Sequence, residues 1–219
     1  PPHLEHAALL PSPEFGLAEH TLPREALEAE IGSSAYYGGL LFEQSGGLHP
    51  AKYLAGLVRV ALDTGAHLQD HLAATRVEGT ARGFDVETPR GVIRCRDVLL
   101  ATNGYTDRVL PALRRRIIPL GSSIIATGPL APDLAASLIP KRRMLFDSKN
   151  FLYYWRLSPD GRRMLFGGRA SFAPTSIPKA RDWLYAAMTR FHPQLLGVAV
   201  EHAWGGQPGF PFDRVPPIG

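Results

Sequence analysis

Cysteine is almost absent from this chain, whose 219 residues contain one, Cys95. A single thiol forms no internal disulfide and builds no cysteine-based metal site. Long apolar runs are also absent, because no stretch approaches the roughly 18 residues that a membrane-spanning helix needs. The N-terminal residues 1–6 lack the basic and apolar regions of a signal peptide. We therefore expect a cytoplasmic protein with no membrane partner and no metal.

Excess charge of either sign is small, because 24 basic side chains stand against 20 acidic ones, a net +4. That balance does not indicate a nucleic-acid partner. The basic clusters at 114–116 and 141–143 are short and lack the interleaved aromatic residues of a single-strand binding surface. We interpret both as solvated helix ends or loops. The hydrophobic share of 45% and charged share of 20% are typical of a globular protein.

The first half of the chain is patterned like an α/β protein. A short helix is predicted over 22–32, with Pro23 in its first turn and Gly32 at its end. Strand-like residues 36–42 precede an amphipathic helix over 50–64, and residues 66–68 resemble a second strand. This order predicts a βαβ unit. The helix carries one apolar stripe, formed by Leu54, Leu57, Val58, Ala61 and Leu62.

A central apolar run, Val98 to Leu100, ends in the turn-forming residues 101–105. A buried parallel strand has this pattern, and ligands of open α/β sheets lie just beyond such strand ends. Residues 75–81, 84–88 and 92–94 alternate and predict a meander that leads into this run. The turn either closes over a nucleotide or is an ordinary loop after a core strand.

The second half of the chain, after about residue 104, is patterned like an α+β protein. Residues 117–127 are rich in strand formers, and a helix is predicted over 132–138. The sequence Ser-Pro-Asp-Gly at 158–161 predicts a hairpin turn between strands at 151–157 and 163–166. An amphipathic helix over 179–191 and a strand over 198–203 follow.

Several segments, taken in order, resemble the FAD-dependent amine and amino-acid oxidoreductases of the D-amino-acid oxidase family. The resemblance includes the glycine oxidase and sarcosine oxidase type, and its branch nearest to this chain is that of the gamma-glutamylputrescine oxidoreductase-like enzymes. It covers the central portion of such an enzyme. The segments are Tyr37–Leu40, Gly47–Pro50, Ala101–Thr106, Ile124–Leu130, Tyr153–Leu157, Phe166–Arg169, Trp204–Gly206 and Asp213–Gly219.

The resemblance implies a fold of mixed class, α/β plus α+β. A partial FAD-binding, Rossmann-like βαβ portion would accompany a mixed, largely antiparallel substrate-domain sheet flanked by helices. The implied organisation is an irregular segment and short helix over 1–34 and a partial FAD-binding domain over 35–104. A substrate-binding domain over 105–203 and a return strand over 204–219 complete it.

The same resemblance implies a reaction and a cofactor. FAD would accept a hydride from a C–N bond of a small-molecule amine or amino acid, giving an imine that hydrolyses. The backbone of Val77 would lie near the adenine. The nucleotide side would be lined by Ala101, Thr102, Asn103 and Gly104.

Three side chains are candidates for binding or orienting the substrate. Tyr154 and Arg156 alternate on one strand, so they share one sheet face, where a hydroxyl and a guanidinium fork would bind a carboxylate. The alternative is a core tyrosine beside an exposed arginine. His49 lies in a strand-to-helix loop, where ligands of α/β folds bind, or else serves as a structural hydrogen-bonding residue.

The Gly-x-Gly-x-x-Gly turn with which this family opens is missing from these residues, as is the glycine-rich segment after Pro-x-Ile-Gly. That turn holds the pyrophosphate at a helix N-terminus. We therefore expect a truncated flavoenzyme that, as this isolated chain, binds FAD weakly or not at all and lacks activity. The alternatives are a flavin-free module that binds a ligand or partner, and one subunit of a split flavoenzyme. Exposed apolar surface would favour self-association or a complementing chain.

Overall fold

The computed structural model describes residues 19–149, 151–171 and 175–212. The chain divides into two compact units. The first unit comprises residues 1–49, 122–170 and 174–205, and the second comprises residues 50–121, 171–173 and 206–219. Most of the expected irregular N-terminal segment, and the end of the expected return strand at 213–219, lie outside the described residues. The proposed functional domain boundaries stay a prediction.

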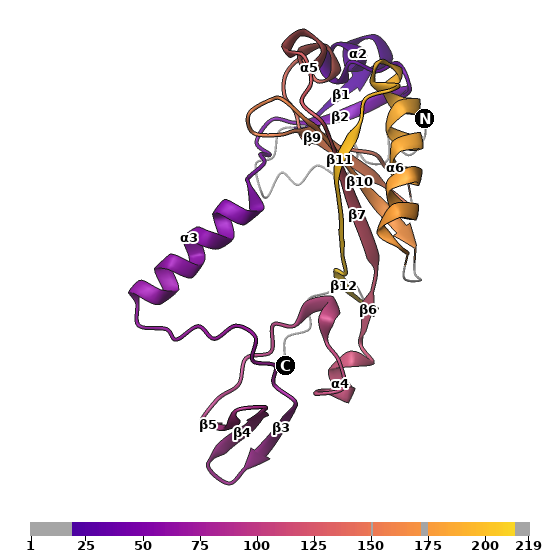
Figure 1. Cartoon of the computed structure of the whole chain (residues 1–219). Coiled ribbons are helices and arrows are strands. Elements are labelled where there is room, and N and C mark those ends of the chain that lie inside the picture. Colours follow the sequence, from indigo (N-terminus) through magenta and orange to yellow (C-terminus); the bar gives the residue numbers. More distant parts are fainter. Residues whose placement is uncertain (1–18, 150, 172–174, 213–219) are drawn as a thin grey trace. The chain divides into compact units, whose positions relative to one another are not determined.

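A five-stranded sheet forms the centre of the first unit, in the order β11-β7-β10-β9-β8 (Figure 1). The hairpin predicted around residues 158–161 is confirmed, since β9 and β10 pair antiparallel with Leu157 opposite Met164. The strand bounds are β7 Gly121–Thr127, β8 Leu145–Phe146, β9 Tyr153–Leu157, β10 Met164–Ser171 and β11 Val200–Gly206.

The hydrophobic core lies on one face of this sheet, beneath α5 (Pro132–Leu138) and α6 (Ile177–Phe191). Figure 1 shows α6 running alongside the sheet. Both helices occur where the sequence predicts them, and the apolar side chains of α6 at helical spacing bury against a common surface. The fully enclosed side chains include Ile125, Leu138, Met164, Phe166 and Met188. The expected mixed class, with an antiparallel sheet flanked by helices, is confirmed.

The N-terminal part of the first unit is a small sheet followed by a helix. Strand β1 (Glu19–Pro23), which the sequence analysis missed, pairs antiparallel with β2 (Gly38–Phe42). Helix α2 (Arg24–Ile31) comes between the two strands in sequence. It ends at Gly32, whose φ of 58° lies in the left-handed region. The predicted helix is confirmed, but Pro23 is its N-cap and the last residue of β1 rather than part of its first turn. Glycine is the residue that adopts the left-handed conformation at the helix end without strain.

The βαβ prediction is wrong in its second strand. Helix α3 (Pro50–Asp63) forms as predicted, but residues 66–68 form no strand and β2 pairs with β1 instead. Because a strand needs a partner for its backbone hydrogen bonds, a short apolar run after a helix does not fold as one alone. No residue of α3 is buried, and Leu54 on its apolar stripe is 62% exposed.

The second unit also contains the predicted meander and a small two-stranded sheet. Strands β3 (Arg76–Thr80), β4 (Gly83–Thr88) and β5 (Gly91–Cys95) pair antiparallel in sequence order. After them come η2 (Asn103–Tyr105), α4 (Pro111–Arg114) and β6 (Ile117–Pro119), which pairs with β12 (Gly209–Pro211). The short 3-10 helix η3 (Pro193–Leu195) belongs to the first unit.

The predicted buried strand at Val98–Leu100 is wrong. These residues form neither helix nor strand, and Leu99 is 92% exposed. An apolar run becomes a central strand only when strands on both sides complete its ladder, and no described strand pairs with it. The run therefore lies open beside the turn that follows it.

Candidate functional site

The face of the five-stranded sheet opposite the core carries the predicted substrate side chains. Trp155 and Leu157 of β9 are buried in the core, so the alternating residues Tyr154 and Arg156 lie on the other face. Phe146 of β8 is opposite Tyr154 and is 66% exposed. The predicted common face of Tyr154 and Arg156 is thus confirmed, and we call it the open face.

Tyr154 lies across the middle of the open face rather than in the core. Gly167 is its cross-strand partner on β10, and a Cβ added there would lie 2.3 Å from the Tyr154 ring. The phenolic oxygen is 2.8 Å from Ser122 Oγ on β7. The glycine therefore makes room for the ring, and the serine holds its polar end.

Arg156 connects the open face to the loop that precedes α3. Its Nη1 donates to the Leu48 carbonyl at 3.0 Å and contacts Met144 Sδ at 3.7 Å. Gly47 allows this approach, because a Cβ there would lie 2.5 Å from the Met144 side chain. Within the described residues, Nε and Nη2 of Arg156 have no recorded partner, so part of the donor fork remains available.

His49 directly follows Leu48 in this loop and is exposed. The structure thus brings the segment that holds His49 to the same face as Arg156. The role predicted for His49 in substrate binding stays a prediction.

The predicted nucleotide-side residues lie in the second unit. Ala101, Thr102 and Asn103 are exposed, whereas Gly104 is buried. Thr102 Oγ1 lies 2.6 Å from Thr106 Oγ1. The turn is therefore at the surface, and part of its hydrogen-bonding capacity is used internally.

Asn103 is the organising residue of this turn. Its Oδ1 accepts hydrogen bonds from the backbone N–H of Gly104 at 2.8 Å and of Gly209 at 2.6 Å. Its φ of 52° lies in the left-handed region, which asparagine tolerates better than most residues. A Cβ at Gly104 would lie 2.0 Å from the Gln207 carbonyl oxygen. The turn is thus locked against the β11–β12 connection.

Val77 lies on β3 opposite Val86, and its side chain is half-buried in the meander. The arrangement leaves its predicted backbone role beside an adenine untested.

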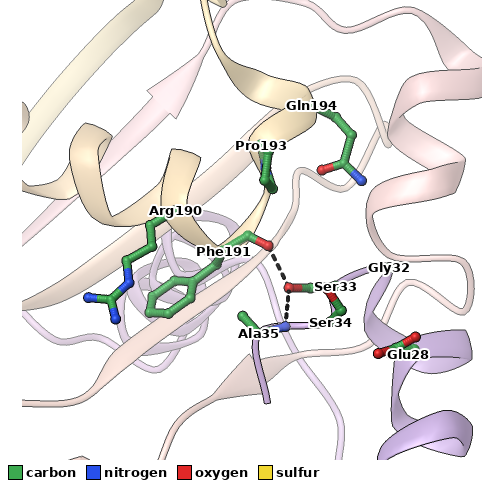
Figure 2. Close-up of a pocket in the computed structure, with 9 residues that line it drawn as sticks. All are labelled: Glu28, Gly32, Ser33, Ser34, Ala35, Arg190, Phe191, Pro193 and Gln194. Carbon is green, nitrogen blue, oxygen red and sulfur yellow. Dashed lines mark hydrogen bonds between the residues drawn. The ribbon is translucent and has the colours of Figure 1, made fainter.

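A pocket of about 450 Å³ lies elsewhere in the first unit, where the C-terminal ends of α2 and α6 meet (Figure 2). Ser33 Oγ donates to the Phe191 carbonyl at 2.5 Å at its base, and the same oxygen accepts from Ala35 N at 3.3 Å. Arg190 and Gln194 lie at its rim. None of the predicted site residues lines it.

Sequence reasoning missed Ser122, Phe146 and Met144, which surround the predicted pair on the open face. Their positions depend on strand neighbours distant in sequence, since Ser122 is 32 residues from Tyr154. The one sequence signal at Ser122 was its place in the strand-forming segment over 117–127, and a strand prediction does not give a residue's neighbours across the sheet.

None of the helices in the described part of the chain is long and apolar enough to cross a bilayer.

Comparison with solved structures shows the fold. The chain superposes on the glycine oxidase of Geobacillus kaustophilus with a TM-score of 0.75 at 16% identity, covering 93% of this chain and 54% of the oxidase. It superposes on NikD, an amino acid oxidase essential for nikkomycin biosynthesis, with a TM-score of 0.73 at 20% identity. This match covers 95% of this chain and 56% of NikD. These likenesses place the chain in the fold of FAD-dependent oxidases.

Sequence comparison adds the family. The chain is 31% identical to the gamma-glutamylputrescine oxidoreductase of Escherichia coli over 199 residues, which is 90% of this chain and 46% of that enzyme. The chain thus spans about half the length of the relatives it matches. Residues 3–219 match the family described as FAD dependent oxidoreductase. The chain therefore belongs to the DAO family of FAD-dependent oxidoreductases.

Proposed function

We propose that this chain carries the substrate-recognition face of a flavoenzyme that oxidises a C–N bond of a small amine or amino acid. The observation that carries the proposal is the open face, where Tyr154 and Arg156 lie side by side on β9 with Phe146 beside them. An aromatic surface with a few convergent polar groups is what small-molecule sites present. The relatives named above include a gamma-glutamylputrescine oxidoreductase and a glycine oxidase.

The residues present fit a substrate better than they fit the whole cofactor. The exposed turn at 101–103 offers a surface for a nucleotide, but Asn103 Oδ1 is committed to two backbone N–H groups. These 219 residues contain no Gly-x-Gly-x-x-Gly turn to hold a pyrophosphate. We therefore propose that polypeptide outside these residues supplies most of the FAD-binding energy.

The roles of the chain's own residues follow from their chemistry. When bound, FAD supplies the hydride acceptor for the oxidation, and the imine product then hydrolyses. Arg156 orients the substrate through the N–H donors that the Leu48 carbonyl leaves available, so it favours a carboxylate or another anionic group. Phe146 and the Tyr154 ring supply apolar surface that excludes water. We assign no general base.

The second proposal concerns a complementing polypeptide. Three leucines of the apolar stripe of α3 are exposed, Leu54 at 62% and both Leu57 and Leu62 at 49%. The solved relatives are almost twice as long as this chain. We propose that segments beyond these residues, on the same polypeptide or on a second one, pack on this stripe. A cytoplasmic location remains a prediction.

The experiment measures flavin and its reduction separately. The purified 219-residue chain should show little or no flavin absorbance after incubation with FAD. The protein from the uninterrupted coding region should bind FAD and be reduced anaerobically by an amine or amino acid from a panel. Stoichiometric flavin on the 219-residue chain would refute the proposal that polypeptide outside these residues supplies most of the FAD-binding energy. No reduction by any member of the panel would refute the proposed reaction.

Variants then test the open face. Arg156→Lys should raise KM for carboxylate-bearing substrates by about tenfold or more, because a point charge replaces a fork. Arg181→Lys is the matched control, since Arg181 lies on α6 and pairs with the exposed Asp182. Equal effects of the two substitutions would show that Arg156 has no role in binding.

A further inference from the structure

The second unit contains a pocket lined mostly by arginine. Its volume is about 260 Å³, and its lining residues are Arg108, Pro111, Arg114 and Arg115. Helix α4 begins at Pro111 and ends at Arg114, so Arg108 lies just before the helix and Arg115 directly after it. Two arginines of the cluster at 114–116 thus lie at a helix end, as the sequence indicates, and share a concave surface with a third. We call it the arginine pocket.

The positive charge of the arginine pocket is not neutralised by an ion pair. Within the described residues, none of its three guanidinium groups has a recorded salt bridge or hydrogen bond. Asp107 is the one carboxylate between residues 98 and 121, and its Oδ1 accepts a hydrogen bond from a backbone N–H two residues further on. The neighbouring elements η2, β6 and β12 contain no acidic residue. The pocket therefore concentrates charge of one sign.

Other arginines of the same unit have carboxylate partners. Arg94 Nε lies 3.8 Å from Asp85, and Arg96 Nε lies 2.7 Å from Asp97. Surface charges of opposite sign placed in this way reduce the local potential. Like charges gathered around one pocket raise it, and such a pocket attracts an anion from solution. The arginine pocket thus has the electrostatics of an anion-binding site.

We propose that the arginine pocket binds a phosphate group, carried by inorganic phosphate or by a small phosphate monoester. A phosphate monoester carries a charge of about −1.5 to −2 at pH 7 and three acceptor oxygens, enough for more than one guanidinium group. A carboxylate carries one charge and two oxygens, which a single guanidinium fork satisfies. Three arginines therefore fit phosphate better than carboxylate. The inference goes beyond the proposed oxidation and does not depend on it.

The size of the pocket favours a small ligand over a nucleic acid. Its volume of about 260 Å³ is slightly below the range of about 300–1,000 Å³ for drug-sized ligands, so it suits a phosphate with a short substituent. A single-stranded nucleic acid needs aromatic side chains among the basic ones, and residues 106–116 contain no aromatic residue.

The test titrates the protein from the uninterrupted coding region with inorganic phosphate and with glycerol 3-phosphate, by calorimetry at constant ionic strength. Both probes should bind saturably, whereas acetate, which brings a single charge, should bind much more weakly. Arg114→Gln combined with Arg115→Gln should weaken both phosphate affinities about tenfold or more, because charge-assisted hydrogen bonds are lost. Tighter binding of glycerol 3-phosphate would support a monoester as the ligand, and the reverse order would support free phosphate.

Arg82→Gln combined with Arg90→Gln is the matched control. It removes the same charge from two exposed turns of the same unit, and neither residue lines the arginine pocket. Equal losses in the two double variants, acetate binding as tightly as phosphate, or no binding of either phosphate probe would overturn the proposal. Reduced flavin absorbance in the variant at 114 and 115 would also overturn it, because the pocket would then serve the cofactor.

Discussion

The carboxylate of Asp147 accepts a hydrogen bond from the Lys149 ammonium at 2.5 Å, and the same ammonium lies 4.6 Å from the centre of the Phe191 ring. The side chain of Asp147 is 2% exposed and also accepts from the Tyr153 backbone N–H at 2.8 Å. Burial, followed by the Asp147 charge, raises the pKa of the Tyr36 hydroxyl above its ordinary value. Tyr36 therefore stays protonated and donates to Asp147 at 3.4 Å.

Lys149→Met should lower the free energy of unfolding by about 2 kcal/mol, because it leaves a buried carboxylate without its cation. The loss is smaller than for a fully buried pair, since the Lys149 side chain is half exposed. Urea unfolding at pH 7 measures it. Lys179→Met is the matched control, because Lys179 lies 4.9 Å from the Trp183 ring centre and should cost about 0.5–1 kcal/mol at this exposed site. Equal losses in the two variants would contradict a role for the carboxylate.

The buried imidazole of His192 should make the folded protein less stable in mild acid. Its side chain is fully buried, and within the described residues neither ring nitrogen has a hydrogen-bond partner. Burial lowers the pKa of the imidazole to about 4. Because the unfolded chain binds this proton near pH 6.5, stability should be full above that pH and fall progressively toward pH 4, by about 3 kcal/mol in all.

The measurement compares free energies of unfolding at pH 7 and pH 4.5. His192→Leu should flatten the part of the pH dependence that this group causes, whereas His202→Gln, at an exposed position on β11, should leave it unchanged. An unaltered slope in His192→Leu would show that other groups account for the acid sensitivity.

Glu30 joins α2 to the segment that follows α5. Burial raises the pKa of this carboxyl. Hydrogen bonds from Lys141 and Arg143 together lower the pKa by more than burial raises it, so the net shift is downward. Arg143 Nε lies 3.0 Å from Glu30 Oε2. The stabilisation from the ionised Glu30 is therefore present above the pKa of this carboxyl in the unfolded chain. It is lost as the pH falls through the pKa of the carboxyl in the folded protein.

Glu30→Gln should cost about 2 kcal/mol at pH 7 and less in acid, because two charge-assisted hydrogen bonds become weaker neutral ones. Urea unfolding at both pH values tests this. Glu28→Gln on the same helix is the control, since Glu28 forms an exposed pair with Arg24 that is worth about 0.3–0.5 kcal/mol. A loss from Glu30→Gln no larger than from the control would contradict the prediction.

Gly104→Ala should destabilise the second unit, because its Cβ would lie 2.0 Å from a backbone oxygen that has no freedom to rotate away. Gly56→Ala should have the opposite sign and stabilise α3 by about 0.5–1 kcal/mol, since nothing lies within 4 Å of a Cβ there. Circular dichroism melting of both variants provides the comparison. A neutral Gly104→Ala would mean that the turn at 101–105 packs differently.

Local signals predicted the elements whose stability is local. The Gly32 end of α2, the turn at 158–161 and the apolar face of α6 were predicted correctly, because each depends on neighbours within a few residues. The common face of Tyr154 and Arg156 followed from strand alternation alone.

Elements that need distant partners were not predicted correctly. Strand β1 exists because β2 completes its ladder, and Val98–Leu100 is no strand because no described strand does the same for it. Ser122 was missed for a similar reason, since its place in the candidate site depends on contact with Tyr154, which lies on a strand two places away in the sheet. Sequence pattern assigns a residue to a face, but only strand order supplies its neighbours.

The uneven burial of the two units has a consequence for amide hydrogen exchange and for proteases. Among the described residues of the second unit, Leu120, at 4% exposed, is the one apolar side chain that is fully enclosed. Segments with little buried apolar contact open at low free-energy cost, well below global unfolding. Backbone amides of α3 should therefore exchange fast, and trypsin should cut first at Lys52 or Arg59, while α6 and the central strands remain protected as one cooperative block.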